Sequence, residues 1–177
     1  MKASVFIATS LDGFIAREDG GIDWLPSDES FDGEDHGYQE FIDSVDALVM
    51  GRNTYELVQS FGIEWPYGEK PVFVVTTRPL DIPENISDTV SVLSGPPGEI
   101  VRQLEGQGYQ HLYVDGGVTI QGFLQEGLIQ TLIMTRIPVL IGSGIPLFGA
   151  IPSDIHLRHL ETHQYENGLV QSKYEVI

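Results

Sequence analysis

A glycine, an arginine and a threonine follow a short apolar run near the middle of the first hundred residues. The run is residues 47–50, and Gly51-Arg52-Asn53-Thr54 comes directly after it and opens a helix-like segment. A short, continuous apolar run is typical of a parallel strand buried on both faces. A glycine turn after such a strand exposes backbone N–H groups at the positive end of a helix dipole, where anions bind. The turn is therefore either a dinucleotide phosphate site or an ordinary turn with a surface arginine.

Two further groups of small and hydroxyl-bearing residues follow other predicted strands. They are Thr76, Thr77 and Arg78 after a strand at 71–76, and Gly116, Gly117, Val118 and Thr119 after a strand at 110–114. Ligands of open parallel sheets bind beyond the carboxyl ends of the strands. Because all three groups are expected at that edge, together they indicate one phosphate-bearing ligand more strongly than any group alone.

Hydrophobic patterning predicts the elements that must position these groups. Strands are expected at residues 2–9, 47–50, 71–76, 90–93, 110–114, 129–137, 155–162 and 169–176, and helices at 30–43, 52–60, 99–105 and 119–126. Loops are expected at 17–23, 81–88 and 139–148, and Asn167-Gly168 predicts a hairpin turn between the last two strands. Strand–helix units followed by a hairpin indicate an α/β fold over residues 1–177 as one domain. Its sheet is mainly parallel with an antiparallel edge, and helices cover both faces.

The charge balance excludes some partners. The chain has 26 Asp and Glu against 9 Lys and Arg, a formal charge of −17. Nucleic acids and anionic membranes bind clustered cations, so neither is an expected partner. Any phosphate that binds must rely on the few arginines. No apolar stretch reaches the length of a membrane span and the start of the chain does not resemble a signal peptide, which favours a cytoplasmic protein.

No metal site is expected from the sequence. Cysteine is absent, which excludes disulfides and thiolate ligands. His156, His159 and His163 lie close together in a predicted strand, where side chains alternate between faces. Only His159 and His163 are expected to share a face, and solvent-exposed strand histidines are the simpler interpretation.

Five segments, in this order, resemble the dihydrofolate reductase superfamily, and in particular the reductases of riboflavin biosynthesis (RibD type). The segments are 10–16, 23–25, 50–56, 115–117 and 138–148, with sequences SLDGFIA, DWL, MGRNTYE, DGG and PVLIGSGIPLF. The resemblance covers nearly the whole chain. It implies the three-layer fold of that superfamily, NADPH as cofactor and a homodimer.

The resemblance also assigns roles to individual residues. It implies that Gly51, Arg52 and Thr54 hold the NADPH phosphates, that Thr76, Thr77 and Arg78 lie near the adenosine 2′-phosphate, and that Gly116, Gly117, Val118 and Thr119 approach the pyrophosphate. Asp28 resembles the acid of the folate enzyme and is otherwise a plain helix N-cap. Ser10 and Asp12 are candidates for contact with nicotinamide and substrate, and Asp12 is otherwise a turn former.

The substrate is less defined than the cofactor. The resemblance implies a ribosylaminopyrimidine, as in 5-amino-6-(5-phosphoribosylamino)uracil reductases. The riboflavin enzymes carry basic residues on the first long helix, whereas residues 30–43 here contain acids and no Lys or Arg. A neutral or cationic ring compound is therefore a second possibility. The sequence is also compatible with a dihydrofolate or pterin reductase, and with a catalytically silent nucleotide-binding dimer module.

Overall fold

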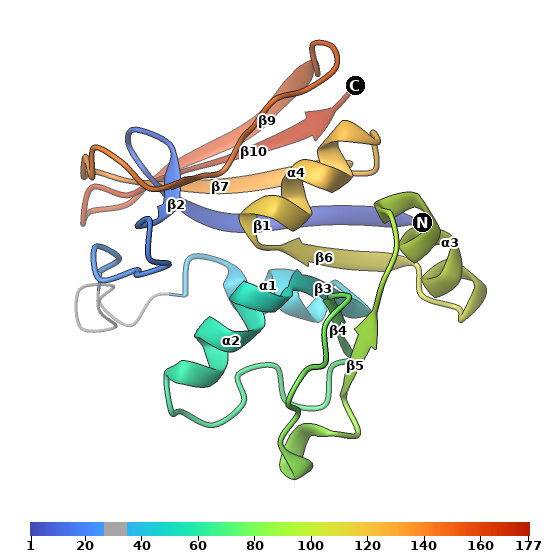
Figure 1. Ribbon diagram of the computed structural model, residues 1–177. Helices are drawn as coiled ribbons and strands as arrows, with labels where there is room; N and C mark the ends of the chain where they lie inside the picture. The colour runs from blue at the N-terminus through green and yellow to red at the C-terminus, as the bar shows by residue number, and fades with distance from the viewer. Residues whose placement is uncertain (27–34) are drawn as a thin grey trace.

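An eight-stranded sheet runs through the computed structural model, which describes residues 1–26 and 35–177 (Figure 1). The strands lie in the order β5-β4-β3-β6-β1-β7-β10-β9. Their bounds are Lys2–Ser10 (β1), Ala47–Gly51 (β3), Val72–Val75 (β4), Val90–Leu93 (β5), His111–Asp115 (β6), Thr131–Ile137 (β7), Leu157–Gln164 (β9) and Val170–Val176 (β10). The strands from β5 to β7 pair in parallel, and β10 and β9 add an antiparallel edge. The predicted sheet is confirmed.

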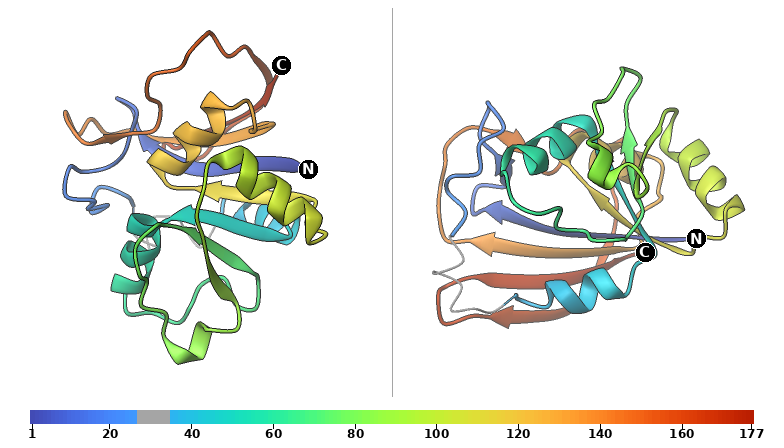
Figure 2. Two further views of the ribbon diagram at one scale, coloured as in Figure 1. Left: turned by 45° about the vertical axis from the view of Figure 1, so that its right-hand side comes forward. Right: turned by 90° about the horizontal axis from the view of Figure 1, so that it is seen from below.

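Four helices of the described residues pack on the two faces of the sheet (Figure 2). They are Tyr38–Asp43 (α1), Arg52–Ser60 (α2), Pro97–Gly106 (α3) and Gly117–Gln125 (α4). Side chains of α1 and α2 pack in one buried cluster and those of α3 and α4 in another. The connections explain this division, because right-handed crossovers that run along the sheet in opposite directions place their helices on opposite faces. We call these the α1 face and the α4 face.

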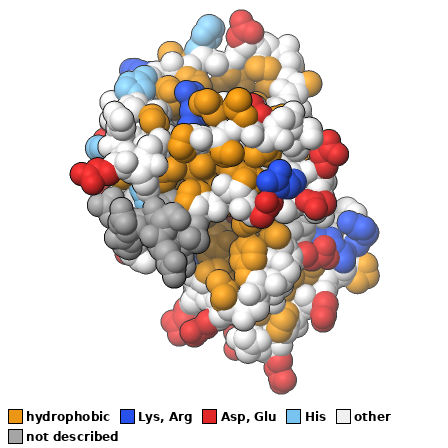
Figure 3. All heavy atoms as spheres, turned by 90° about the vertical axis from the view of Figure 1, so that its left-hand side faces the viewer, with side chains coloured by type: hydrophobic (Ala, Val, Ile, Leu, Met, Phe, Trp, Pro, Cys, Tyr) orange, Lys and Arg blue, Asp and Glu red, His pale blue; other side chains and the backbone are white. Residues whose placement is uncertain are grey.

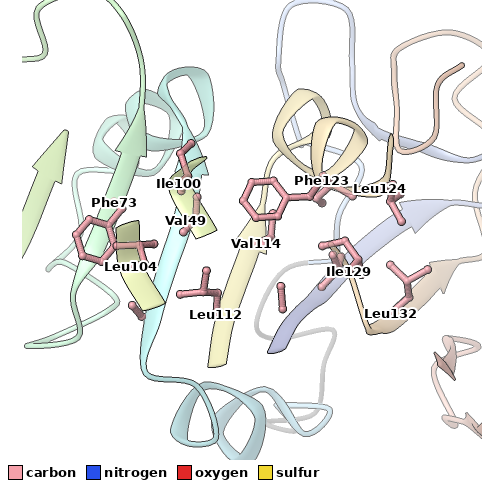
Figure 4. Close-up of a cluster of buried hydrophobic side chains, with 14 of the residues drawn as sticks. Val49, Phe73, Ile100, Leu104, Leu112, Val114, Phe123, Leu124, Ile129 and Leu132 are labelled. Atoms are coloured by element: carbon pink, nitrogen blue, oxygen red, sulfur yellow. The ribbon is translucent and has the colours of Figure 1, made fainter. Parts of the chain in front are cut away.

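The α4 face holds the larger cluster of buried apolar side chains (Figure 4). Val49 and Val114 lie on its central strands and are fully buried. Ile100 and Leu104 reach them from α3, and Phe123 from α4. Each such side chain contributes roughly 1.5–3 kcal/mol relative to an exposed one. The central strands, and therefore the turns at their carboxyl ends, are held rigidly.

The helix expected over residues 30–43 is wrong at residues 35–37. The observed helix begins at Tyr38, and residues 30–34 lie outside the described residues. His36 and Gly37 both have positive φ, 53° and 81°, which a right-handed helix does not allow. The Asp35 carboxylate accepts hydrogen bonds from the backbone N–H groups of Gly37 and Gln39, at 3.0 and 2.8 Å. Asp35 therefore stabilises a turn that delays the start of the helix.

Two expected loops contain short regular elements. Phe14–Ala16 (β2) and Ile145–Pro146 (β8) form a small antiparallel pair, and Glu84–Ile86 (η2) is a single 3₁₀ turn. The β2–β8 pair joins the segment after β1 to the glycine-rich loop after β7. Both segments follow carboxyl ends of parallel strands, so the pair forms one wall of that edge.

The expectation that His159 and His163 share a face is wrong. The register between β9 and β10 shifts between Lys173 and Tyr174, where β9 has one extra residue. The extra residue reverses the alternation, so His159 packs on Tyr174 while His163 lies near Glu161 on the other face. Within residues 1–26 and 35–177, no group of three or more metal-binding side chains was found. No helix in the described part of the chain is long and apolar enough to cross a membrane.

Candidate active site at the carboxyl edge of the sheet

The N-termini of α2 and α4 meet at the carboxyl edge of the sheet. Met50 pairs with Asp115 in the register of β3 and β6, so the turns that follow these residues lie side by side. A side chain added at Gly116 would place its Cβ 2.4 Å from the Thr54 Oγ1 atom. One added at Gly51 would lie 2.9 Å from the Thr119 Oγ1 atom. Only glycine lets the two turns approach this closely, so the structure brings the first and third predicted groups together.

The first N–H groups of both helices lack side-chain caps. The N-cap residues Gly51 and Gly116 make no capping hydrogen bond, and neither helix has an acid in its first turn. By contrast, α1 has Glu40 and α3 has Glu99 in the first turn. Among the described acids, Asp115 lies at these turns, just before α4, where its carboxylate accepts a hydrogen bond from the Gly116 N–H. Free N–H groups and a positive dipole end are what an anion requires.

Arg52 joins the start of α2 to the segment after β4. Its Nε atom donates to Glu56 Oε1 at 2.6 Å, and Nη1 donates to the Pro79 carbonyl oxygen at 2.8 Å. The other guanidinium N–H groups remain available for an anion, because arginine has five donors. Arg52 is partly exposed, so it lies at the rim of the edge.

The second predicted group lies on the adjacent strand end. β4 pairs with β3, which places Thr76, Thr77 and Arg78 next to the turn at Gly51. The Thr76 hydroxyl accepts a hydrogen bond from the Arg78 backbone N–H at 3.1 Å. Thr77 and Arg78 are exposed. The structure thus places all three groups along one edge, as the sequence predicts.

Gly117 and Val118 differ in environment. Gly117 is buried, and a Cβ there would lie 3.0 Å from the Ile15 Cδ1 atom and 3.4 Å from the Ile145 Cγ2 atom. It therefore lets α4 pack against the β2–β8 pair. Val118 is 83% exposed in the first turn of α4, an unusual position for an apolar side chain. Thr119 is partly buried, with its hydroxyl directed at Gly51.

Ser10 and Asp12 hold the wall formed by the segment after β1. Ser10 is fully buried, and its hydroxyl accepts a hydrogen bond from the Phe14 backbone N–H at 3.0 Å. The exposed Asp12 carboxylate accepts from the backbone N–H groups of Ile141 and Gly142, at 3.3 and 2.8 Å. A side-chain hydrogen bond with Ser10, and then these backbone N–H groups, lower the pKa of Asp12. Asp12 is therefore ionised and ties the loop at 139–148 to the edge. Asp28, the other predicted acid, lies outside the described residues.

Asp115 is included in the sequence analysis only within the DGG segment at 115–117 and has no role assigned there, but the structure makes it a candidate residue. It lies at the carboxyl end of β6, on the α1 face, and its Oδ1 atom accepts a hydrogen bond from the Gly116 N–H at 2.7 Å. Burial raises its pKa from 3.8 to about 6, against the opposing effect of that hydrogen bond. Burial and the nearby charge of Asp115 in turn raise the pKa of Tyr38 to about 12. A carboxyl group with a pKa near neutrality, next to an anion-binding edge, can hold a proton for a reaction.

Figure 3 faces the carboxyl edge of the sheet and shows its surface composition. Apolar side chains gather across the middle of this face, and charged side chains lie mainly around them. A flat ring can pack on such a surface, while charged groups of a ligand would reach the rim.

A separate cavity of about 460 Å³ lies on the α1 face, away from the paired turns. Its walls include Lys2 and Ser4 from the amino half of β1, and Thr131 from the start of β7. These residues lie toward the opposite edge of the parallel strands. The N-termini of α2 and α4 do not line this cavity, and neither does Asp115, so we place the candidate active site at the carboxyl edge.

Comparisons with known proteins identify the family of the chain. Residues 2–171 match the model of a family described as the RibD C-terminal domain. A protein from Shewanella sp. PV-4, provisionally assigned to riboflavin biosynthesis, is 40% identical with a TM-score of 0.91, covering 100% of this chain and 99% of that one.

Two more distant structures show the same fold. The deaminase/5-amino-6-(5-phosphoribosylamino)uracil reductase of Thermotoga maritima has a TM-score of 0.74 at 14% identity, covering 99% of this chain and 56% of that one. Dihydrofolate reductase from Enterococcus faecalis, in complex with NADP(H), has a TM-score of 0.67 at 17% identity, covering 99% and 96%. The dihydrofolate reductase-like fold expected from the sequence is confirmed.

Proposed function

Because the chain belongs to the RibD C-terminal domain family, we propose that it is a reductase of the riboflavin-pathway type that uses NADPH. The reaction would transfer a hydride to a small heterocyclic or ribosylaminopyrimidine-type substrate. The observation that carries the proposal is the pair of adjacent helix N-termini that have no side-chain cap and no acid in the first turn, in a chain with 26 Asp and Glu.

The residues at the carboxyl edge fit a dinucleotide with several phosphates. The N–H groups at the start of α2 and α4 would bind the pyrophosphate oxygens, and the Thr54 and Thr119 hydroxyls lie beside them. Thr76, Thr77 and Arg78, one strand further along, would bind the 2′-phosphate of the adenosine. Arg52 lies between these two positions and can contribute a charged hydrogen bond to either phosphate.

A proton donor is needed beside the cofactor. When bound, reduced nicotinamide supplies a hydride, which adds to an electron-poor carbon of a C=N bond in the substrate. The carbon–nitrogen π electrons then pass to the nitrogen, which must gain one proton. Asp115 is the described acid with a raised pKa at this edge, so we assign it to hold that proton. It regains a proton from water after each turnover.

The test is NADPH oxidation by the purified protein with a panel of pterins, aminopyrimidines and flavin precursors. We expect turnover with at least one of these compounds and loss of turnover in Asp115→Asn. Tight NADPH binding without turnover on any of them would instead support the catalytically silent module. Absence of NADPH binding would contradict the proposal itself.

A further inference from the structure

The positions of the cations restrict what the substrate can carry. All nine Lys and Arg lie in residues that the structure describes, so each can be followed to its partners. Those away from the carboxyl edge are Lys2 at the start of β1, Lys70 before β4, Arg102 within α3, and Arg158 and Lys173 in the β9–β10 hairpin. Of these, Lys70 donates to the Val45 carbonyl oxygen, Arg158 pairs with Glu175 and Lys173 pairs with Glu161.

The cations at the carboxyl edge are placed for the cofactor or are otherwise engaged. Arg52 and Arg78 lie on the side of β3 and β4 that we assign to the cofactor phosphates. Arg17 donates from Nε and Nη2 to both carboxylate oxygens of Asp23, at 2.5 and 2.9 Å. Arg136 lies on the same face of β7 as the buried Leu132 and Met134, which is the α4 face, so it points away from the α1 face.

The surroundings of Asp115 are aromatic. Tyr113 lies two residues earlier on the same face of β6, and Tyr38 and Tyr67 come from α1 and from the segment before β4. Asp115 acts electrostatically on all three rings, since its charge raises the pKa of each phenol. Among the described residues, its hydrogen-bond donor is the Gly116 N–H and it forms no ion pair with Lys or Arg.

A carboxylate in this setting selects its ligand by charge and by hydrogen bonding. It is stabilised by a ligand that offers N–H donors or positive charge, because both compensate its lost hydration. A substrate phosphate beside Asp115 would meet none of the described Lys and Arg, apart from those assigned to the cofactor, and residues 27–34 contain no base that could supply one. The overall charge of −17 would also slow the approach of an anionic substrate.

We infer that the substrate is a phosphate-free heteroaromatic ring whose N–H groups bind Asp115 beside Tyr38 and Tyr67. This inference rests on the proposed reductase function, and it names the substrate class of the same site. It differs from the phosphorylated substrate named for the Thermotoga maritima enzyme. The binding energy would come from ring stacking and from N–H donation to one carboxylate, not from phosphate recognition.

Paired ring probes test the inference by calorimetry, with and without NADPH. We expect 2,4-diaminopyrimidine to bind and uridine 5′-phosphate to bind at least about tenfold more weakly. The reason is that the phosphate of uridine 5′-phosphate would find no Lys or Arg to pair with beside Asp115. Asp115→Asn should weaken the diaminopyrimidine by about tenfold or more, since it loses a charged hydrogen bond. Asp88→Asn, an exposed carboxylate between β4 and β5, is the matched control and should change nothing.

Two results would overturn the inference. One is tighter binding of uridine 5′-phosphate than of the diaminopyrimidine, and the other is equal diaminopyrimidine binding by Asp115→Asn and wild type. Turnover gives a second measure, because 5-amino-6-(ribosylamino)uracil should be reduced at least as efficiently as its 5′-phosphate. A clear preference for the phosphate in the presence of bound NADPH would refute the substrate class and leave the reductase proposal intact. Binding of the diaminopyrimidine without any binding of NADPH would support the substrate class and contradict the reductase proposal.

Discussion

Asp115→Asn is predicted to stabilise the protein at neutral and alkaline pH while it abolishes activity. Burial raises the pKa of Asp115 from 3.8 to about 6 in the folded chain. Between these pH values the folded chain holds a proton that the unfolded chain has released. The free energy of unfolding therefore falls as pH rises through this window, and the full penalty is present above the folded pKa.

The magnitude follows from the pKa difference. A change from 3.8 to about 6 corresponds to at most about 3 kcal/mol. Asparagine keeps the shape of the side chain and an Oδ1 acceptor for the Gly116 N–H, which lies at 2.7 Å. The variant thus removes the charge of this partly buried side chain with little change in packing. We expect it to be more stable than wild type by up to about 3 kcal/mol at about pH 8, and nearly equal at about pH 4.

Urea unfolding followed by circular dichroism at both pH values measures the difference. Asp88→Asn serves as the control, because its exposed carboxylate should give the same stability as wild type at each pH. NADPH oxidation measured on the same preparations should be lost in Asp115→Asn alone. A variant that is destabilised at both pH values, or stabilised equally at both, would refute the reasoning. So would a stabilised variant with full activity.

The remaining predictions concern the cofactor, the glycines, the loop wall and the assembly. Arg52→Ala should weaken NADPH binding by about 1.5–3 kcal/mol in calorimetry, because a charged hydrogen bond is lost, whereas Arg158→Ala on β9 should not. Gly116→Ala should cost more stability in urea than Gly68→Ala: both glycines have positive φ, but only at Gly116 would the new Cβ clash with Thr54. Asp12→Ala should speed hydrogen exchange at the amides of Ile141 and Gly142, whereas Asp19→Ala should not. In wild type that protection should hold above pH 3.8 and be lost as the pH falls through the lowered pKa of Asp12. Light scattering should give twice the monomer mass, because every residue of edge strand β9 is exposed in the single chain; a monomer mass would contradict the homodimer.

The sequence pattern predicts the sheet and the turns at its carboxyl edge, because each strand and the turn after it are contiguous in sequence. Residues 47–50 are apolar throughout since β3 is buried on both faces, and Gly51 follows at once as a helix N-cap. Gly116 likewise follows the last residue of β6, Asp115, and is the N-cap of α4. Because parallel strands share one carboxyl edge, identifying the strands is enough to place the turns together.

The features that the sequence does not predict depend on contacts between segments far apart in the chain, or on backbone conformation. The pairing of Phe14 with Pro146 joins segments far apart in sequence, and neither segment alternates clearly. The early part of the expected helix fails at Gly37, where a positive φ overrides the periodic apolar pattern. The role proposed for Asp115 depends on burial and on tyrosines from other elements, so a carboxylate at a strand end gives no local signal of it.

The central claim is that the turns after β3, β4 and β6 bind a single NADPH molecule. Amide chemical shifts of the isotope-labelled protein during an NADPH titration test it most directly. We expect saturable shifts at Gly51–Thr54, Thr76–Arg78 and Gly117–Thr119 with one common dissociation constant. Unchanged shifts at these amides with millimolar NADPH, or saturation confined to another part of the chain, would contradict it.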